Sequence, residues 1–270
     1  MIPNVLSIAG SDPSGGAGIQ ADLKTFSALG AYGMAVITAL TAQNTQGVRS
    51  FQTVDPTFVA EQIDAIFADV RVDAVKIGMV ATAEIATAIA DRLRQHGARN
   101  VVLDPVMVAK SGHHLLQADA VTELRDKLVP LAQVTTPNLP EAAVLLGSQE
   151  PASLADMWQA VRALNRLGSK WVLLKGGHLT GEVSTDLLFD GTTVTELPAR
   201  RIATQNTHGT GCTLSSAITA LLPRFDMVEA VRRAKAYLTD AIAASAQLSV
   251  GSGHGPVHHF HAIWQKDQTP

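Results

Sequence analysis

A short apolar run, a glycine-rich loop and the start of a helix follow one another in residues 5–19, VLSIAGSDPSGGAGI. Val5–Ala9 has the length and aliphatic content of a buried strand, and the loop Gly10–Gly18 holds four glycines. Glycines permit tight turns and let a ligand approach the backbone closely. Because open α/β sheets bind ligands beyond the carboxyl ends of their strands, this loop is the first candidate for a binding site.

The alternation of strand and helix continues along the chain. Apolar runs without polar alternation are typical of parallel strands that are covered on both faces. We expect strands at Val5–Ala9, Ala35–Ala39, Ala74–Ile77, Val101–Leu103, Val134–Thr136 and Trp171–Leu174. Helical patterns lie near Ile19 and at Pro56–Val70, Ala83–His96, Ser153–Leu167, Thr210–Leu222 and Val228–Leu248. A hairpin is expected from Ser184–Phe189 and Thr193–Leu197 around Asp190-Gly191.

This pattern predicts an α/β fold with a central, mostly parallel sheet flanked by helices. Residues 1–270 contain no linker, repeat or low-complexity tract, so we expect one domain. The single cysteine, Cys212, excludes a disulfide within the chain, and the N-terminus lacks a signal-peptide pattern. These features predict a cytoplasmic protein.

The composition argues against several classes of protein. The chain is 46% hydrophobic and 17% charged, which is typical of a folded globular protein. A net charge of −3 gives no basic stripe for nucleic acid. Ser27–Val48 and Ile202–Pro223 lack charged residues, but they hold several Gln, Asn, Thr or Gly residues and do not suit a membrane span. Such stretches can instead line a pocket for a neutral or anionic ligand.

The glycine-rich loop resembles a dinucleotide fingerprint only superficially. Gly16–Ala21 matches G-x-G-x-x-A, but the loop from Gly10 is too long for the tight turn of that fingerprint. No acidic residue lies between Asp22 and Asp55 to hold a ribose hydroxyl. We reject a dinucleotide site and expect a substrate-contacting loop with Asp22 aimed at the ligand. A glycine-rich turn with a helix cap is the alternative.

A polar segment, Thr41–Thr45, follows the expected strand Ala35–Ala39. The side-chain amide of Gln43 can donate and accept hydrogen bonds. At the carboxyl end of a strand, this group suits a flat heterocycle that carries ring nitrogens and an amine. The alternative is a solvated polar turn.

Three further motifs follow predicted strands. Asp104 comes after Val101–Leu103, where an acid suits metal or phosphate chemistry, although Asp also starts turns. Asn138 and Glu141 are three residues apart at an expected helix start, so they can form a capping box or an outer-shell magnesium site. Lys175, beside two glycines, can approach a phosphate, and the chain contains no P-loop pattern.

The most specific motif is the segment NTHGTGCTL at residues 206–214. Gly209 and Gly211 lie where a helix begins, and such a helix start directs backbone N–H groups at an anion. A transferring phosphoryl group develops charge that these donors stabilise. The positive end of the helix is expected to lower the pKa of Cys212. The alternative is a small buried cysteine at a helix start.

The C-terminal histidines are His254, His258, His259 and His261. They resemble a metal-binding tract, but no Cys, Asp or Glu lies among them before Asp267. We expect a solvated tail or lid here rather than a zinc site.

Taken in order, these motifs resemble the ribokinase superfamily, and within it the hydroxymethylpyrimidine/phosphomethylpyrimidine kinases of thiamine biosynthesis. The matching segments are residues 9–22, 38–45, 102–106, 136–141, 175–178, 208–212 and 253–256. The resemblance covers nearly the whole chain. It implies a ribokinase-like three-layer fold, in a homodimer with one site per subunit.

The resemblance also implies transfer of phosphate from ATP, with Mg²⁺, to the hydroxymethyl group of the pyrimidine and then to the resulting monophosphate. It implies that Gln43 holds the pyrimidine, helped by Asp22, Gly10 and Met79. No nucleic acid or membrane partner is implied.

For the phosphates, the resemblance implies an anion hole at Gly209–Cys212, which includes Gly211, and a contact from Lys175. It places Asn138 and Glu141 in a magnesium–water network near Asp104. Many superfamily members carry an aspartate general base where this chain, like the pyrimidine kinases, carries Cys212. Whether Cys212 takes the proton or orients the hydroxyl stays open.

Two alternatives remain from the sequence. A pyridoxal or pyridoxine kinase of the same subfamily would phosphorylate a similar flat ring with a hydroxymethyl group. A non-catalytic metabolite-binding protein could retain the fold, but Cys212, Lys175 and the glycine-rich helix start argue against it.

Overall fold

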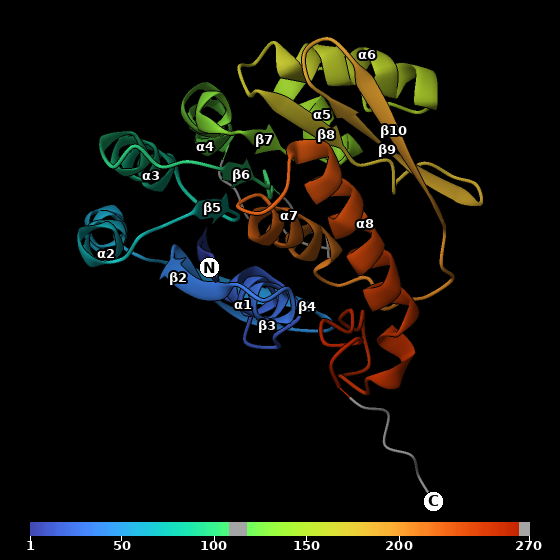
Figure 1. The fold of residues 1–270 in the computed structure, drawn as a ribbon, viewed down its shortest axis with the longest axis horizontal. Coiled ribbons are helices and arrows are strands. Elements are labelled where there is room, and N and C mark those ends of the chain that lie inside the picture. Colours follow the sequence, from blue (N-terminus) through green and yellow to red (C-terminus); the bar gives the residue numbers. More distant parts are fainter. Residues whose placement is uncertain (108–117, 265–270) are drawn as a thin grey trace, which may run out of the picture.

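The computed structural model describes residues 1–107 and 118–264. An eight-stranded sheet forms its centre, with helices on both faces, and a separate two-stranded sheet lies beside it (Figure 1). The large sheet consists of β1 Asn4–Ala9, β2 Tyr32–Ile37, β5 Ala74–Ile77, β6 Val101–Leu103, β7 Val134–Thr135, β8 Trp171–Leu174, β9 Val183–Phe189 and β10 Val194–Arg200. The small sheet pairs β3 Ala39–Asn44 with β4 Gly47–Thr53.

The strand order of the large sheet is β10-β9-β8-β7-β6-β5-β1-β2. Strands β1, β2 and β5 to β8 run parallel, and the hairpin β9–β10 pairs antiparallel with β8. The chain moves from β1 to β2 in one direction and from β5 to β8 in the other. The carboxyl ends of β1 and β5 therefore flank the switch point where such sheets bind ligands.

Two helical layers cover this sheet (Figure 1). One face carries α1 Gly18–Ala28, α7 Thr210–Leu221 and α8 Met227–Ala243. The other carries α2 Pro56–Asp69, α3 Ala83–Gln95, α4 Ala118–Glu123, α5 Leu139–Leu146 and α6 Leu154–Asn165. Short π and 3-10 turns occupy Leu124–Leu128, Val129–Leu131 and Ser245–Gln247. None of the helices described is long and apolar enough to cross a membrane.

The alternation of side chains along each strand explains the two layers. In β5, Val75 and Ile77 pack into the core shared with α2 and α3, whereas Ala74 packs into the core beneath α1. In β6, Val101 and Leu103 face the same side as Val75, and Val102 faces α7 and α8. Because both faces are buried, these strands are continuous apolar runs in the sequence.

The structure confirms the predicted α/β fold and most of its elements. The strands Ala74–Ile77, Val101–Leu103 and Trp171–Leu174 have the predicted bounds, and the hairpin forms as β9–β10. The predicted long helix at Val228–Leu248 ends at Ala243 and is followed by a 3-10 turn.

Two predictions about the segments after α1 are wrong. The strand expected at Ala35–Ala39 is β2, which begins earlier, at Tyr32, and ends at Ile37. Thr41–Thr45 does not directly follow the carboxyl end of β2, because most of it lies in β3 of the small sheet. The alternative of a solvated polar turn is excluded for the same reason. Polar and apolar residues alternate along β3, so this strand is not a continuous apolar run and was not predicted from the sequence.

Two of the four C-terminal histidines contradict the expected solvated tail, whereas His254 is exposed. His258 is 4% exposed and His259 is 5% exposed. His259 Nε2 lies 3.1 Å from Thr213 Oγ1 in α7, and His258 N–H donates to the Ala241 carbonyl oxygen. Burial lowers the pKa of His259 to about 3, so this ring is neutral at physiological pH. The segment is thus docked against α7 and α8.

Candidate active site

A cavity of about 500 Å³ opens at the carboxyl edge of the parallel strands. Its walls come from β3, from the segments after β1, β5, β6 and β8, from the start of α5 and from the first turn of α7. This volume lies in the range that holds a small organic ligand. The fold thus places the cavity at the switch point between β1 and β5.

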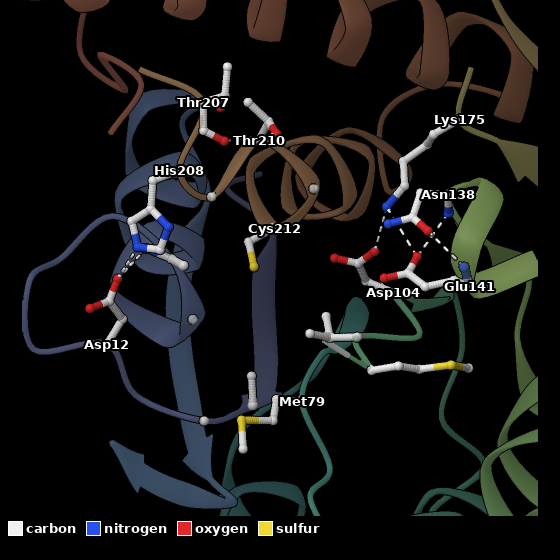
Figure 2. A pocket seen from close by; sticks show the side chains of 18 of the residues that line it. Asp12, Met79, Asp104, Asn138, Glu141, Lys175, Thr207, His208, Thr210 and Cys212 are labelled. Atoms are coloured by element: carbon white, nitrogen blue, oxygen red, sulfur yellow. Dashed lines mark hydrogen bonds and ion pairs between the residues drawn. The ribbon is translucent and has the colours of Figure 1, made fainter. Parts of the chain in front are cut away.

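All of the predicted site residues except Asp22 line this cavity. They are Gly10, Gln43, Met79, Asp104, Asn138, Glu141, Lys175, Gly209, Gly211 and Cys212. The structure therefore brings together residues from six motifs that are far apart in the sequence. Figure 2 shows Cys212 between two polar groups, with Lys175, Asp104, Asn138 and Glu141 on one side and Asp12 and His208 on the other.

The first turn of α7 forms one wall. Gly209 caps the helix with φ +75°, and a β-carbon there would collide with the carbonyl oxygen of Gly16. Glycine is therefore required by both conformation and space. The N–H group of Thr210 is donated to the Thr207 carbonyl oxygen at 3.4 Å. The N–H groups of Gly211 and Cys212 have no partner within the helix, so they can be offered to an anion in the cavity.

Lys175 and two carboxylates form the polar group beside this turn. Lys175 Nζ donates to Asp104 Oδ1 at 3.0 Å and lies 3.9 Å from Glu141 Oε2. Thr136 and Ser215 also donate hydroxyl hydrogen bonds to Asp104, at 3.1 and 3.2 Å. The cluster combines one cation that can contact phosphate with carboxylates that can face a divalent cation.

Burial and charge move the pKa values of this group in different directions. Burial works to raise the pKa of Asp104, but the cations of Lys175 and Lys76 hold it below its ordinary value. Burial also works to lower the pKa of Lys175, but Asp104 and Glu141 raise it. For Glu141, burial and the nearby charge of Asp104 outweigh Lys175 and raise the pKa to about 7.

Asn138 and Glu141 form a complete capping box at the start of α5. Asn138 N–H donates to Glu141 Oε2, and Glu141 N–H donates to Asn138 Oδ1, both at 2.8 Å. Both residues also line the cavity. The two sequence interpretations are therefore compatible, since the cap holds the Glu141 carboxylate beside Lys175.

Cys212 contradicts the sequence prediction of a lowered pKa. Burial raises the pKa of the Cys212 thiol to about 11, and the cation of Lys76 offsets this only in part. At neutral pH the side chain is therefore a thiol.

The prediction that Asp22 is aimed at the ligand is wrong, because Asp22 does not line the cavity. Its fully buried carboxylate pairs with Lys76 Nζ at 2.8 Å. It also accepts hydrogen bonds from Ser7 and Ser216, each at 2.6 Å. Because a buried charge must be paired, Asp22 belongs to the framework of the site.

Sequence reasoning gave no role to four titratable residues of the cavity wall: Asp12, Lys76, His178 and His208. Asp12, His178 and His208 lie inside the sequence motifs named above, but none of them was assigned a function. Lys76 carried a usable signal, because it is a single charge in the middle of an apolar run that was predicted to be a buried strand.

A three-layer α/β fold with a glycine-rich helix start, a lysine and two carboxylates at one strand edge defines a ribokinase-like phosphotransferase. The chain matches the model of the family described as phosphomethylpyrimidine kinase over residues 12–258. The chain belongs to this family.

Known proteins agree with this assignment. The hydroxymethylpyrimidine/phosphomethylpyrimidine kinase of Rhizobium meliloti (strain 1021) is 58% identical over 96% of this chain and 98% of its own. The thiamine biosynthesis bifunctional protein ThiED of Geobacter sulfurreducens is 52% identical over 95% of this chain and 52% of its own. Among solved structures, an ADP complex of Bacillus subtilis pyridoxal kinase has a TM-score of 0.91 and 38% identity, covering 98% of this chain and 100% of its own.

The raised pKa of Cys212 predicts slow alkylation at neutral pH. The thiolate fraction, and with it the rate of reaction with iodoacetamide, should rise about tenfold per pH unit from pH 7 to pH 9 without a plateau. Mass spectrometry can follow the reaction, because Cys212 is the single cysteine. The urea-unfolded chain is the control and should level off above about pH 8.5. A plateau below pH 8 in the folded protein would contradict the assigned environment.

The two glycines of the helix start should respond differently to alanine. Gly209→Ala requires a left-handed backbone with a side chain and should cost more than about 2 kcal/mol of unfolding free energy. A β-carbon on Gly211 would lie 3.3 Å from Lys175 Nζ and 3.6 Å from Asp104 Oδ2, in the cavity. Gly211→Ala should therefore keep the melting temperature while lowering kcat about tenfold. Equal stability losses in both variants would refute this distinction.

Proposed function

We propose that this chain is an ATP-dependent kinase that phosphorylates 4-amino-5-hydroxymethyl-2-methylpyrimidine and then its monophosphate, in thiamine biosynthesis. The observation that carries the proposal is the arrangement of the α7 helix start, Lys175 and Gln43 around one cavity. One end of this cavity suits phosphate, and the other suits a heterocycle. The names of the Rhizobium and Geobacter relatives support this substrate and pathway.

The phosphate end works by positioning and by stabilising charge. The hydroxymethyl oxygen attacks the γ-phosphorus of ATP, and the bond from that phosphorus to the bridging oxygen breaks to release ADP. Negative charge spreads over the transferring oxygens. The N–H groups at Gly209–Cys212 and the Lys175 ammonium would stabilise this charge, because they are already oriented before the reaction.

A magnesium ion fits the carboxylate pair beside Lys175. Within the described residues there is no cluster of three or more His, Cys, Asp or Glu side chains suited to a metal. Asp104 and Glu141 offer hard oxygen ligands, and Mg²⁺ in kinases commonly keeps several waters and shares its shell with substrate phosphates. These two carboxylates, with Asn138 behind Glu141, would hold the hydrated ion. When bound, the ion would neutralise charge on the phosphate oxygens.

Cys212 lies between the two ends of the cavity (Figure 2). A thiol with a pKa near 11 keeps its own proton at neutral pH, so it cannot take the proton from the substrate hydroxyl. We assign it an orienting role toward that hydroxyl. In a loose transition state the proton leaves late, and the oxygens of a phosphate monoester are basic enough to accept it.

The heterocycle end contains Gln43, Met79 and Gly10. Met79 supplies a polarizable apolar surface for a flat ring. Gly10 keeps this surface open, because a β-carbon there would lie 3.0 Å from the Met79 sulfur. Gln43 supplies the hydrogen bonds that distinguish one heterocycle from another.

The proposal extends to assembly and location. The family resemblance supports a homodimer with one site per subunit, and the single cysteine, Cys212, supports a location in the cytoplasm. Pyridoxal kinase activity is the second candidate, and the close backbone match to the Bacillus pyridoxal kinase favours it as a side activity.

A coupled assay of ADP release tests the proposed function. The wild-type chain with Mg-ATP should turn over the aminopyrimidine and its monophosphate, with a higher kcat/KM for the aminopyrimidine than for pyridoxal. Lys175→Met should lower kcat about 100-fold or more, because a charge-stabilising donor is lost. Lys127→Met is the control, since it removes an ion pair with Glu123 outside the cavity. A large preference for pyridoxal, or full activity of Lys175→Met, would contradict the proposal.

A further inference from the structure

Residues 251–256 run between the small sheet and the start of α7, and we call this segment the strap. In Figure 1 the chain after α8 turns back toward the small sheet. His254 N–H donates to the Thr45 carbonyl oxygen at 2.9 Å, and Gly253 N–H donates to the Thr45 hydroxyl at 3.2 Å. Thr45 lies in the turn between β3 and β4. The first half of the strap therefore holds the turn of the sheet that carries Gln43.

The second half of the strap contacts the segment before α7. His208 N–H donates to the Gly255 carbonyl oxygen at 3.0 Å, and His208 and Pro256 pair as a parallel bridge. His208 directly precedes Gly209, which caps α7. The His208 side chain in turn reaches the loop after β1, because its Nε2 lies 2.7 Å from Asp12 Oδ2. The strap therefore also holds the helix start at the other end of the cavity.

Two glycines let the strap pass this closely. A β-carbon on Gly253 would collide with the Thr45 carbonyl oxygen, and one on Gly255 would collide with the side-chain oxygen of Asn206. Neither glycine has a positive φ, so space rather than backbone conformation requires glycine here. The side chain of His254, between them, is exposed. The strap thus makes its contacts through its backbone rather than through the imidazole.

We propose that the strap is a positioning element that sets the separation between the small sheet and the start of α7, and so aligns the acceptor hydroxyl with the transferring phosphoryl group. The structure describes all six strap residues, and none of them lines the cavity, so they act through Thr45 and His208. Transfer is sensitive to such placement, since a shift of about 1 Å can lower a rate about 100-fold. The inference rests on the proposed function, because that function assigns the two ends of the cavity.

Substitutions at the small sheet test the first contact. Gly253→Ala places a methyl group against the backbone of Thr45 and should raise the KM of the aminopyrimidine about tenfold, with the KM of ATP within about threefold of wild type. Thr45→Val is milder, since it removes only the hydroxyl that accepts from Gly253, and should raise the same KM about threefold. Thr45→Ser keeps that hydroxyl and should match the wild type.

The control for these variants is His254→Ala, which keeps the backbone N–H that donates to Thr45 and should also match the wild type. A role in structural support alone would lower the melting temperature and leave the KM values of the folded enzyme unchanged. That result in both Gly253→Ala and Thr45→Val would overturn the proposal.

A suppressor tests the second contact. Gly255→Ala places a methyl group against the side chain of Asn206, and the displaced start of α7 should lower kcat about tenfold. Asn206→Ala removes the colliding atoms and leaves a β-carbon 3.6 Å from the new methyl group, which is an ordinary contact. The double variant should therefore recover kcat to within about threefold of Asn206→Ala alone. A double variant as slow as Gly255→Ala would overturn the proposal.

Alkylation of Cys212 tests the same contact without any substrate. Cys212 is the single cysteine and lies in the first turn of α7. At pH 9, Gly255→Ala should react with iodoacetamide more than about threefold faster than the wild type, because the displaced helix start exposes the thiol. His254→Ala and the double variant should react at the wild-type rate. Equal rates in all four proteins would overturn the proposal. If the wild type phosphorylates no hydroxymethyl heterocycle, the proposed function fails, and these rates alone decide whether the strap positions the helix start.

Discussion

The buried ion pair between Asp22 and Lys76 holds together the elements on which the cavity depends. Lys76 in β5 donates to both carboxylate oxygens of Asp22 in α1, at 3.0 and 2.8 Å. Ser7 in β1 and Ser216 in α7 donate to the same carboxylate. Two strands at the switch point and two helices are thus tied at one point. Removing one partner of such a pair leaves a buried charge and typically costs about 3–5 kcal/mol.

This framework also sets the electrostatics of the site. Lys76 helps to keep Asp104 ionised, and Asp104 in turn holds Lys175 at the cavity wall. The same lysine lowers the pKa of Cys212 but does not overcome its burial. Under the proposed function, fixed charges and helix N–H groups would contact the phosphates, while the neutral thiol of Cys212 and the amide of Gln43 would contact the acceptor molecule. This division suits phosphoryl transfer, which depends on positioning and charge stabilisation.

The sequence predicts the strands of the sheet and the edge at which the site lies, but not the directions of the side chains in the site. Strands that are buried on both faces, such as Ala74–Ile77, are visible as apolar runs, and the polar residues after them meet at one edge by topology alone. Directions of side chains are not visible in this way. Asp22 pairs with a lysine 54 residues away, and His259 packs against Thr213, 46 residues away. The prediction of a lowered pKa for Cys212 was wrong for the same reason, because burial within the fold raises this pKa.

A double-mutant cycle on Asp22 and Lys76 tests most directly the claim that this pair organises the cavity. Unfolding free energies are measured by urea denaturation for the wild type, Asp22→Asn, Lys76→Met and the combined variant. We expect each single variant to lose about 3–5 kcal/mol, and the double variant to lose less than the sum of the two by more than about 1 kcal/mol. Single losses below about 1 kcal/mol that add without coupling would contradict the account.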